Sequence, residues 1–225
     1  MLNKIKLIIF DLDGTLADTL WEIRDGINAT LTAFGMSTVN YTTVKGGINN
    51  GPRKLCQAML PEPQRSDEAF VDEFLARYNE EYGKVYMNTK KTYEGIRETV
   101  AELHRRGYRL AVLSNKQDSY VKALVANLFP DGEIEFALGS TGDLKKPDPA
   151  LTLSLIKSVD PALTPRQCAL VGDSDVDVLT ARNAGAVSVG ASWGYRGREF
   201  LERSHADIVI DRPEELTAVF GRLIS

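Results

Sequence analysis

Two aspartates directly follow a short apolar run near the start of the chain. The run Leu7–Phe10 consists of four bulky apolar residues, which indicates a strand that is buried on both faces. Asp11 and Asp13 come next, and because side chains alternate along an extended chain, both lean to the same side. Paired carboxylates at the edge of a core are costly unless they are compensated. We therefore expect a metal ion or fixed cations beside them.

Two later segments carry polar groups that suit an anionic ligand. Ser114 and Asn115 follow a second apolar run, where a hydroxyl and N–H groups can hold phosphoryl oxygens. Lys146 precedes a proline, and a rigid turn there would present its ammonium to a negative charge. Lys145 is the alternative if the register differs by one residue. Each segment alone is also typical of an ordinary helix-capping turn.

A third segment adds two more carboxylates. Asp173 closes the apolar run Cys168–Gly172, and Asp177 follows one helical turn later. Carboxylate oxygens are hard ligands of the kind that Mg²⁺ prefers, so Asp11 and Asp173 are candidate metal ligands. Acidic residues also suit the first turn of a helix, which is a purely structural explanation for Asp177.

Strand-like apolar runs alternate with helical segments in the second half of the chain. The expected strands cover 109–114, 134–138, 168–173, 187–191 and 208–210. The expected helices cover 95–106, 118–127, 149–159, 176–183 and 198–203, with a last one beginning at 213. This alternation predicts an α/β fold with a Rossmann-like parallel sheet core wrapped by helices.

The interval before the second strand is too long for a simple crossover. About 95 residues separate Asp13 from that strand, and a βαβ connection needs only a dozen or more. Helices are expected over 18–34, with Asp18 as the N-cap, from 52 to about 60, and over 66–85. The segment 37–50 is polar and rich in Gly and Asn. We expect a core of 1–15 and 93–225, with a small all-α cap domain over 16–92.

Composition limits the possible partners and compartment. The net charge is −4 and the basic residues form no long run, which argues against a nucleic-acid or membrane-surface partner. Cys56 and Cys168 are the only cysteines, which suggests buried thiols in a reducing cytoplasm. The N-terminal apolar run is shorter than a signal peptide or a membrane span. A small molecule is the expected partner, and the composition fits a monomer as well as a homodimer.

The aspartate pair carries a family resemblance. The segment Asp11-Leu12-Asp13-Gly14-Thr15 resembles the first motif of the haloacid dehalogenase-like hydrolase superfamily. Ser114, Lys146 and the Gly-Asp-x-x-x-Asp segment at 172–177 match its later motifs in the expected order. The superfamily's first type of helical cap is inserted directly after the first motif, which agrees with the expected domain boundaries.

The resemblance implies a mechanism. Asp11 would be the nucleophile that forms an aspartyl-phosphate, and Asp13 would act as general acid and then as base. Mg²⁺ would be bound by the carboxylates of Asp11 and Asp173 and by the backbone carbonyl of Asp13. An acid two residues after the nucleophile favours phosphoryl transfer over dehalogenation.

The remaining site residues follow from the same resemblance. Ser114, the Asn115 amide and Lys146 would hold the charged oxygens of the phosphoryl group. Asp177 would orient water or Lys146 rather than contact the metal.

One loop of the expected cap bears on the substrate. The segment 46–54 is rich in Gly and Asn, runs into a helix start and is followed by cations, so it can bind a carboxylate or phosphate. It resembles the specificity loop of phosphoglycolate phosphatases, as does Trp193-Gly194-Tyr195 after a core strand. Arg53 is the candidate substrate contact, and 2-phosphoglycolate is the best candidate substrate. A sugar phosphomutase of the β-phosphoglucomutase type and a non-catalytic regulator remain alternatives.

Overall fold

The computed structural model describes residues 4–48, 51–141 and 144–221. The chain divides into two compact units: Met1–Asp18 joined with Lys91–Ser225, and Thr19–Lys90. The first unit contains the sheet and the second is helical. None of the helices in the described ranges combines the length and the apolar composition that crossing a membrane requires.

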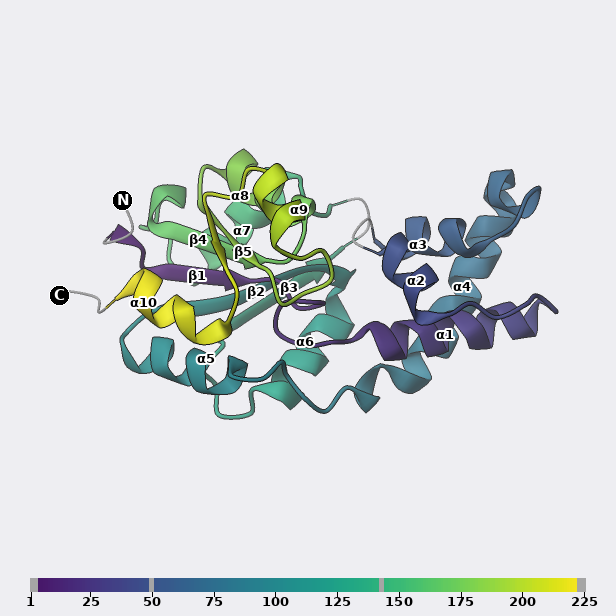
Figure 1. Ribbon diagram of the computed structural model, residues 1–225, viewed down its shortest axis with the longest axis horizontal. Helices are drawn as coiled ribbons and strands as arrows, with labels where there is room; N and C mark the ends of the chain where they lie inside the picture. The colour runs from purple at the N-terminus through teal and green to yellow at the C-terminus, as the bar shows by residue number, and fades with distance from the viewer. Residues whose placement is uncertain (1–3, 49–50, 142–143, 222–225) are drawn as a thin grey trace. The chain divides into compact units, whose positions relative to one another are not determined.

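A six-stranded parallel sheet forms the centre of the first unit (Figure 1). Its order is β3-β2-β1-β4-β5-β6, so the chain reverses its direction of winding between β1 and β4. The strands are β1 (Leu7–Phe10), β2 (Arg109–Gln117), β3 (Phe136–Ser140), β4 (Cys168–Gly172), β5 (Val187–Ala191) and β6 (Ile208–Ile210). This arrangement confirms the predicted Rossmann-like α/β fold.

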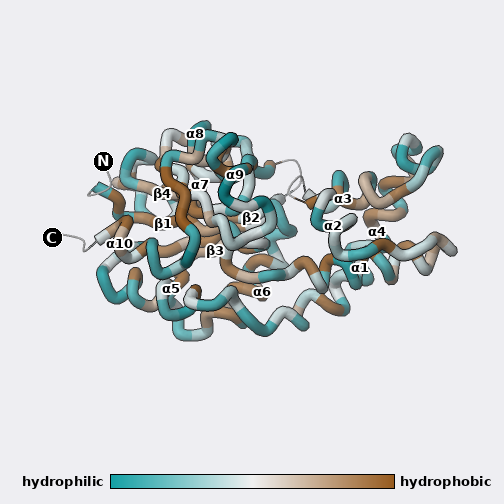
Figure 2. The backbone as a smooth tube through the Cα atoms, in the orientation of Figure 1, coloured by the Kyte–Doolittle hydropathy of each residue, from teal (hydrophilic) through white to brown (hydrophobic). Residues whose placement is uncertain are grey.

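Helices cover both faces of this sheet (Figure 1). One face carries α5 (Ile96–Arg105), α6 (Asp118–Leu128) and α10 (Leu216–Phe220), and the other carries α7 (Pro149–Val159), α8 (Asp175–Ala184) and α9 (Arg198–Arg203). Hydrophobic residues are frequent along the strands, whereas hydrophilic and hydrophobic residues are mixed along the helices (Figure 2). Leu7, Ile9 and Leu170 pack with Leu155 of α7 in a buried core cluster, which explains the apolar runs read from the sequence.

The switch in strand order places the carboxyl ends of two strands, β1 and β4, side by side. Phe10 pairs with Val112 of β2 on one side and with Val171 of β4 on the other. The Asp11 N–H then donates to the Val171 carbonyl at 2.8 Å. Open α/β sheets bind ligands beyond the carboxyl ends of their strands at such a switch point. The residues that follow β1 and β4 are therefore placed where such a fold binds its ligand.

The described residues of the second unit form four α-helices, with short 3₁₀ turns at Gln64–Ser66 and Tyr86–Asn88. The helices are α1 (Leu20–Ala33), α2 (Tyr41–Gly47), α3 (Pro52–Met59) and α4 (Glu68–Val85). Phe34 packs against Phe70 and Phe74, with ring centroids 5.2 and 5.4 Å apart. Gly26 brings α1 close to α4, because an added Cβ would lie 3.1 Å from the Tyr82 Cβ. Apolar contacts between α1 and α4 thus hold this unit together.

The structure differs from the local expectations in several places, and it contains one helix that was not predicted. The segment 37–50 contains the short helix α2, because the Asn40 side chain accepts a hydrogen bond from the Thr43 N–H at 2.9 Å and caps its start. The N-cap of α1 is Thr19 rather than Asp18, and the Asp18 carboxylate accepts a hydrogen bond from the Tyr195 hydroxyl. Strand β2 ends at Gln117 rather than 114, since it pairs with β3 again after a register irregularity.

Candidate active site

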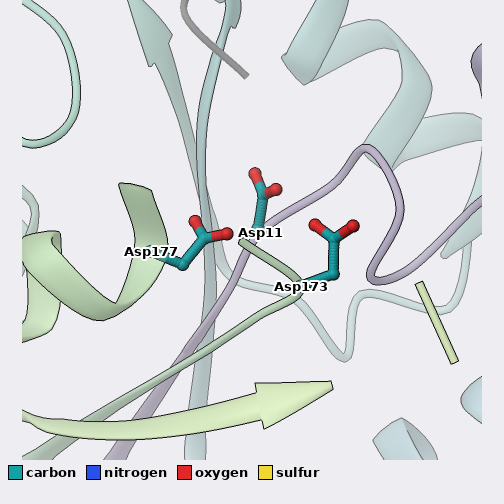
Figure 3. A group of neighbouring side chains, drawn as sticks. All are labelled: Asp11, Asp173 and Asp177. Atoms are coloured by element: carbon teal, nitrogen blue, oxygen red, sulfur yellow. The ribbon is translucent and has the colours of Figure 1, made fainter. Parts of the chain in front are cut away.

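Three carboxylates converge at the carboxyl end of the sheet (Figure 3). Asp11 follows β1, Asp173 follows β4, and Asp177 lies in the first turn of α8. One oxygen of each lies within 4.8 Å of the others, and all three residues are buried. Asp11 and Asp173 are neighbours because β1 and β4 are paired. Asp177 joins them because Gly172 leaves room: an added Cβ there would lie 2.2 Å from the Asp177 Cγ.

Lys146 supplies the positive charge of this cluster. Its Nζ lies 2.8 Å from Asp11 Oδ1 and 2.7 Å from Asp177 Oδ1, and its side chain is buried. The Asn115 side chain fixes the Lys146 backbone, accepting from its N–H at 2.7 Å and donating to its carbonyl at 3.1 Å. Lys145 is exposed. The register question left open by the sequence is therefore settled in favour of Lys146 as the lysine that reaches Asp11.

Burial dominates the electrostatics of the cluster. It raises the pKa of Asp11 to about 7, although the Lys146 ammonium acts in the opposite direction. Burial also raises the pKa of Asp173 well above its usual value, and the charges of Asp177 and Asp11 add to this effect. Burial acts to lower the pKa of Lys146, but the Asp11 and Asp177 carboxylates outweigh it and raise that pKa. One ammonium does not neutralise three carboxylates, so the site favours a further cation.

Asp173 has one oxygen available for such a cation. Its Oδ2 accepts a hydrogen bond from the Tyr195 N–H at 2.7 Å. Its Oδ1 is buried and has no hydrogen-bond partner within the described part of the chain. Gly14 and Gly194 leave room for this carboxylate, because an added Cβ would lie 2.5 Å from Oδ2 and 2.3 Å from the Asp173 Cβ respectively. The orphaned oxygen, beside Asp11, fits a divalent cation that prefers hard oxygen ligands.

Asp177 is already engaged on both oxygens. Lys146 contacts Oδ1, and the Ser174 hydroxyl and N–H donate to Oδ2 at 2.6 and 3.1 Å. These contacts suit a residue that orients Lys146.

Asp13 is held by two groups from β2. The Lys116 Nζ lies 2.9 Å from Asp13 Oδ1, and the Ser114 hydroxyl donates to Oδ2 at 3.4 Å. Lys116 was not predicted as a site residue, because the strand was expected to end at 114. On the longer strand, residues 114 and 116 lie on the same side, so alternation identifies Lys116 only once the strand is known to continue past 114.

Arg53 lies in the helical unit and contacts carboxylates of that unit. Its Nε lies 3.0 Å from Asp72 Oδ1 and its Nη2 lies 2.5 Å from Glu68 Oε2, which joins α3 to α4. Residues 49–50 of the loop 46–54 lie outside the described residues. The structure therefore shows Arg53 as part of a three-residue ionic cluster on the surface of its unit.

The chain belongs to the haloacid dehalogenase-like hydrolase family, whose model matches residues 8–191. It is 31% identical over 227 residues to a phosphoglycolate phosphatase of Vibrio vulnificus strain CMCP6, covering 96% of each protein. It is 32% identical to a phosphoglycolate phosphatase of Agrobacterium fabrum, covering 97% of this chain and 94% of the relative. A crystal structure described as a predicted phosphoglycolate phosphatase from Haemophilus somnus 129PT superposes with a TM-score of 0.86 at 28% identity, covering 96% and 98% of the two chains. Family and relatives together identify the enzyme class as phosphatase.

Proposed function

We propose that this phosphatase is a Mg²⁺-dependent phosphomonoesterase that acts on a small acidic metabolite, with 2-phosphoglycolate as the best candidate. The observation that carries the proposal is the buried Asp11 carboxylate, paired with Lys146 and beside an Asp173 oxygen that lacks a partner in the described part of the chain. The substrate is proposed from the relatives, which are called phosphoglycolate phosphatases.

In the first step, an Asp11 oxygen attacks phosphorus and the bond from phosphorus to the ester oxygen breaks. Asp13 protonates the leaving oxygen, which gives the free alcohol and an aspartyl-phosphate. In the second step, Asp13 takes a proton from water, which attacks phosphorus and releases inorganic phosphate and the Asp11 carboxylate. Asp13 is suited to this double role because Ser114 and Lys116 fix its two oxygens.

The negative charge of the phosphoryl group needs compensation in both steps. Ser114, the Asn115 amide and Lys146 are proposed to hold its oxygens. Mg²⁺, held by the carboxylates of Asp11 and Asp173 and the backbone carbonyl of Asp13, would reduce the repulsion between nucleophile and phosphate. Asp177 keeps the Lys146 ammonium in place.

The helical unit is proposed to act as a cap that recognises the rest of the substrate. Arg53 is its proposed contact for the substrate carboxylate, and it would exchange its exposed partners Glu68 and Asp72 for that ligand. Such exposed ion pairs contribute little stability, so the exchange costs about 1 kcal/mol or less per pair. We also propose a cytoplasmic location, which the two buried free thiols support.

A panel of phosphoesters incubated with purified protein and Mg²⁺ tests the proposed activity. We expect release of inorganic phosphate, with the highest kcat/KM for 2-phosphoglycolate, and none from Asp11→Asn. Failure to release phosphate from any ester would overturn the proposal. A higher kcat/KM for a neutral sugar phosphate would retain the hydrolase and reject the acidic substrate.

Substitution of Arg53 tests the recognition role. Arg53→Ala should raise KM for 2-phosphoglycolate about tenfold and leave KM for p-nitrophenyl phosphate unchanged, since only the first carries a carboxylate. Arg77→Ala is a matched control, because Arg77 also lies in the helical unit and pairs with two carboxylates, Glu80 and Glu81. Equal changes for both substrates would remove Arg53 from recognition.

A further inference from the structure

The loop after β5 contacts two functionally different parts of the sheet unit. The Tyr195 N–H donates to Asp173 Oδ2 at 2.7 Å, and the Tyr195 hydroxyl donates to Asp18 Oδ1 at 3.1 Å. The ring lies against Gly14, where an added Cβ would approach the Tyr195 Cδ2 to 2.6 Å. Tyr195 is buried, at 5% exposure. One residue therefore contacts both a proposed metal ligand and the Asp18 carboxylate.

Asp18 occupies a special place in the chain. It is the last residue of the sheet unit before the helical unit begins at Thr19, and the chain returns to the sheet unit at Lys91. The returning segment is tied to the departing one, because the Tyr93 N–H donates to the Leu16 carbonyl at 3.0 Å. The sheet-unit ends of both connections are thus joined by a direct hydrogen bond.

A neighbouring side chain of the same loop reinforces this junction. The Trp193 Nε1–H donates to the Thr15 carbonyl at 3.0 Å. The segment 15–18 is thereby held at both ends by residues 193 and 195.

We propose that Tyr195 is a positioning residue. It links Asp18, where the chain leaves the sheet unit, to the Asp173 carboxylate. Its backbone N–H positions the carboxylate, and its hydroxyl positions Asp18. The inference rests on the proposed function in one respect: loss of the hydrogen bond between Tyr195 and Asp18 changes KM only if the helical unit recognises the substrate. Because the two contacts use different atoms, Tyr195→Phe removes the Asp18 contact and keeps the Asp173 contact.

Hydrogen exchange gives a readout that is independent of activity. The Leu16 and Ala17 amides donate to the Leu12 carbonyl, and the Tyr93 amide donates to Leu16, so all three are protected. Tyr195→Phe should speed their exchange about tenfold, because a hydrogen bond to a charged group is worth a factor of about ten or more. The same variant should bind Mg²⁺ with unchanged affinity.

Tyr108→Phe is the matched control. Tyr108 is also buried in the sheet unit and donates its hydroxyl to the Phe220 carbonyl. Its removal should leave the exchange of Leu16, Ala17 and Tyr93 unchanged. If these three amides exchange at the same rate in Tyr195→Phe and Tyr108→Phe, the inference is overturned.

A double-mutant cycle completes the test. Asp18→Ala should reproduce the faster exchange of Tyr195→Phe, and the double variant should be no faster than either single variant. Additive effects would show that the two residues act separately and would overturn the inference. KM for 2-phosphoglycolate should rise about tenfold in both single variants. If the wild type hydrolyses no phosphoester, the proposed function fails, and the exchange data alone decide the role of Tyr195.

Discussion

The Lys146 ammonium lies 2.8 Å from the Asp11 carboxylate, although the two residues are 135 positions apart in the chain. The contact depends on the turn before α7 and on Asn115, which holds the Lys146 backbone from β2. Lys146 is shared with Asp177, so it compensates only part of the charge that Asp11 and Asp173 bring to the same place. The remaining negative charge is what makes the site suited to a divalent cation.

Removing this ammonium should destabilise the protein. Lys146→Met leaves buried carboxylates without their counter-charge, which typically costs about 3–5 kcal/mol. Unfolding by denaturant in the presence of EDTA measures the loss. Lys145→Met, at the exposed neighbour, should change the free energy of unfolding by less than about 0.5 kcal/mol. Equal stabilities of the two variants would contradict the assigned ion pairs.

Gly194 should be required for the proposed metal site. In Gly194→Ala the new Cβ would lie 2.3 Å from both the Asp173 Cβ and the Gly14 carbonyl, so the loop or Asp173 must move. We expect weaker Mg²⁺ binding, by about tenfold or more, in isothermal titration calorimetry. Ser192→Ala, in the same loop without an added Cβ, is the control. Unchanged Mg²⁺ affinity in Gly194→Ala would contradict the close packing around Asp173.

The raised pKa of Asp11 predicts how stability and Mg²⁺ binding depend on pH. A carboxyl whose pKa is higher in the folded chain binds its proton more tightly there. Burial raises the pKa of Asp11 from 3.8 to about 7, so metal-free stability should fall as pH rises through this interval. Mg²⁺ competes with that proton, and its apparent affinity should weaken about tenfold for each pH unit below the Asp11 pKa.

Thermal unfolding with and without Mg²⁺ measures this dependence. The increase in Tm caused by Mg²⁺ should be larger one unit above pH 7 than one unit below it. In Asp11→Asn the increase should be small at both values, because the titrating ligand is gone. An increase in the wild type that is the same at both pH values would show that Asp11 is not the competing group.

The sheet and the carboxylate cluster were predictable because parallel strands present their carboxyl ends at one edge. Asp11 and Asp173 each follow an apolar strand, which places both at that edge, and the family resemblance supplied the expectation that the two strands are neighbours. The structure adds Lys116, whose contact with Asp13 depends on β2 continuing past Ser114. That continuation comes from pairing with β3, which the local sequence does not encode.

Contacts between distant loops were also beyond the sequence. Asp18 has the residue type and position of an N-cap, and only the fold shows that the Tyr195 hydroxyl takes its carboxylate. The short helix α2 contains Thr and Gly, which are weak helix formers, and no helix was predicted there. The contact between Tyr195 and Asp18 is tertiary, so no local preference encodes it.

Trapping the phosphorylated enzyme tests the central claim most directly. We predict that rapid acid quenching during turnover of radiolabelled 2-phosphoglycolate places the labelled phosphoryl group on the peptide that contains Asp11. Asp11→Asn should carry no label although it remains folded. Turnover by the wild type without any label on that peptide, or with label on another residue, would contradict the assignment of Asp11 as nucleophile.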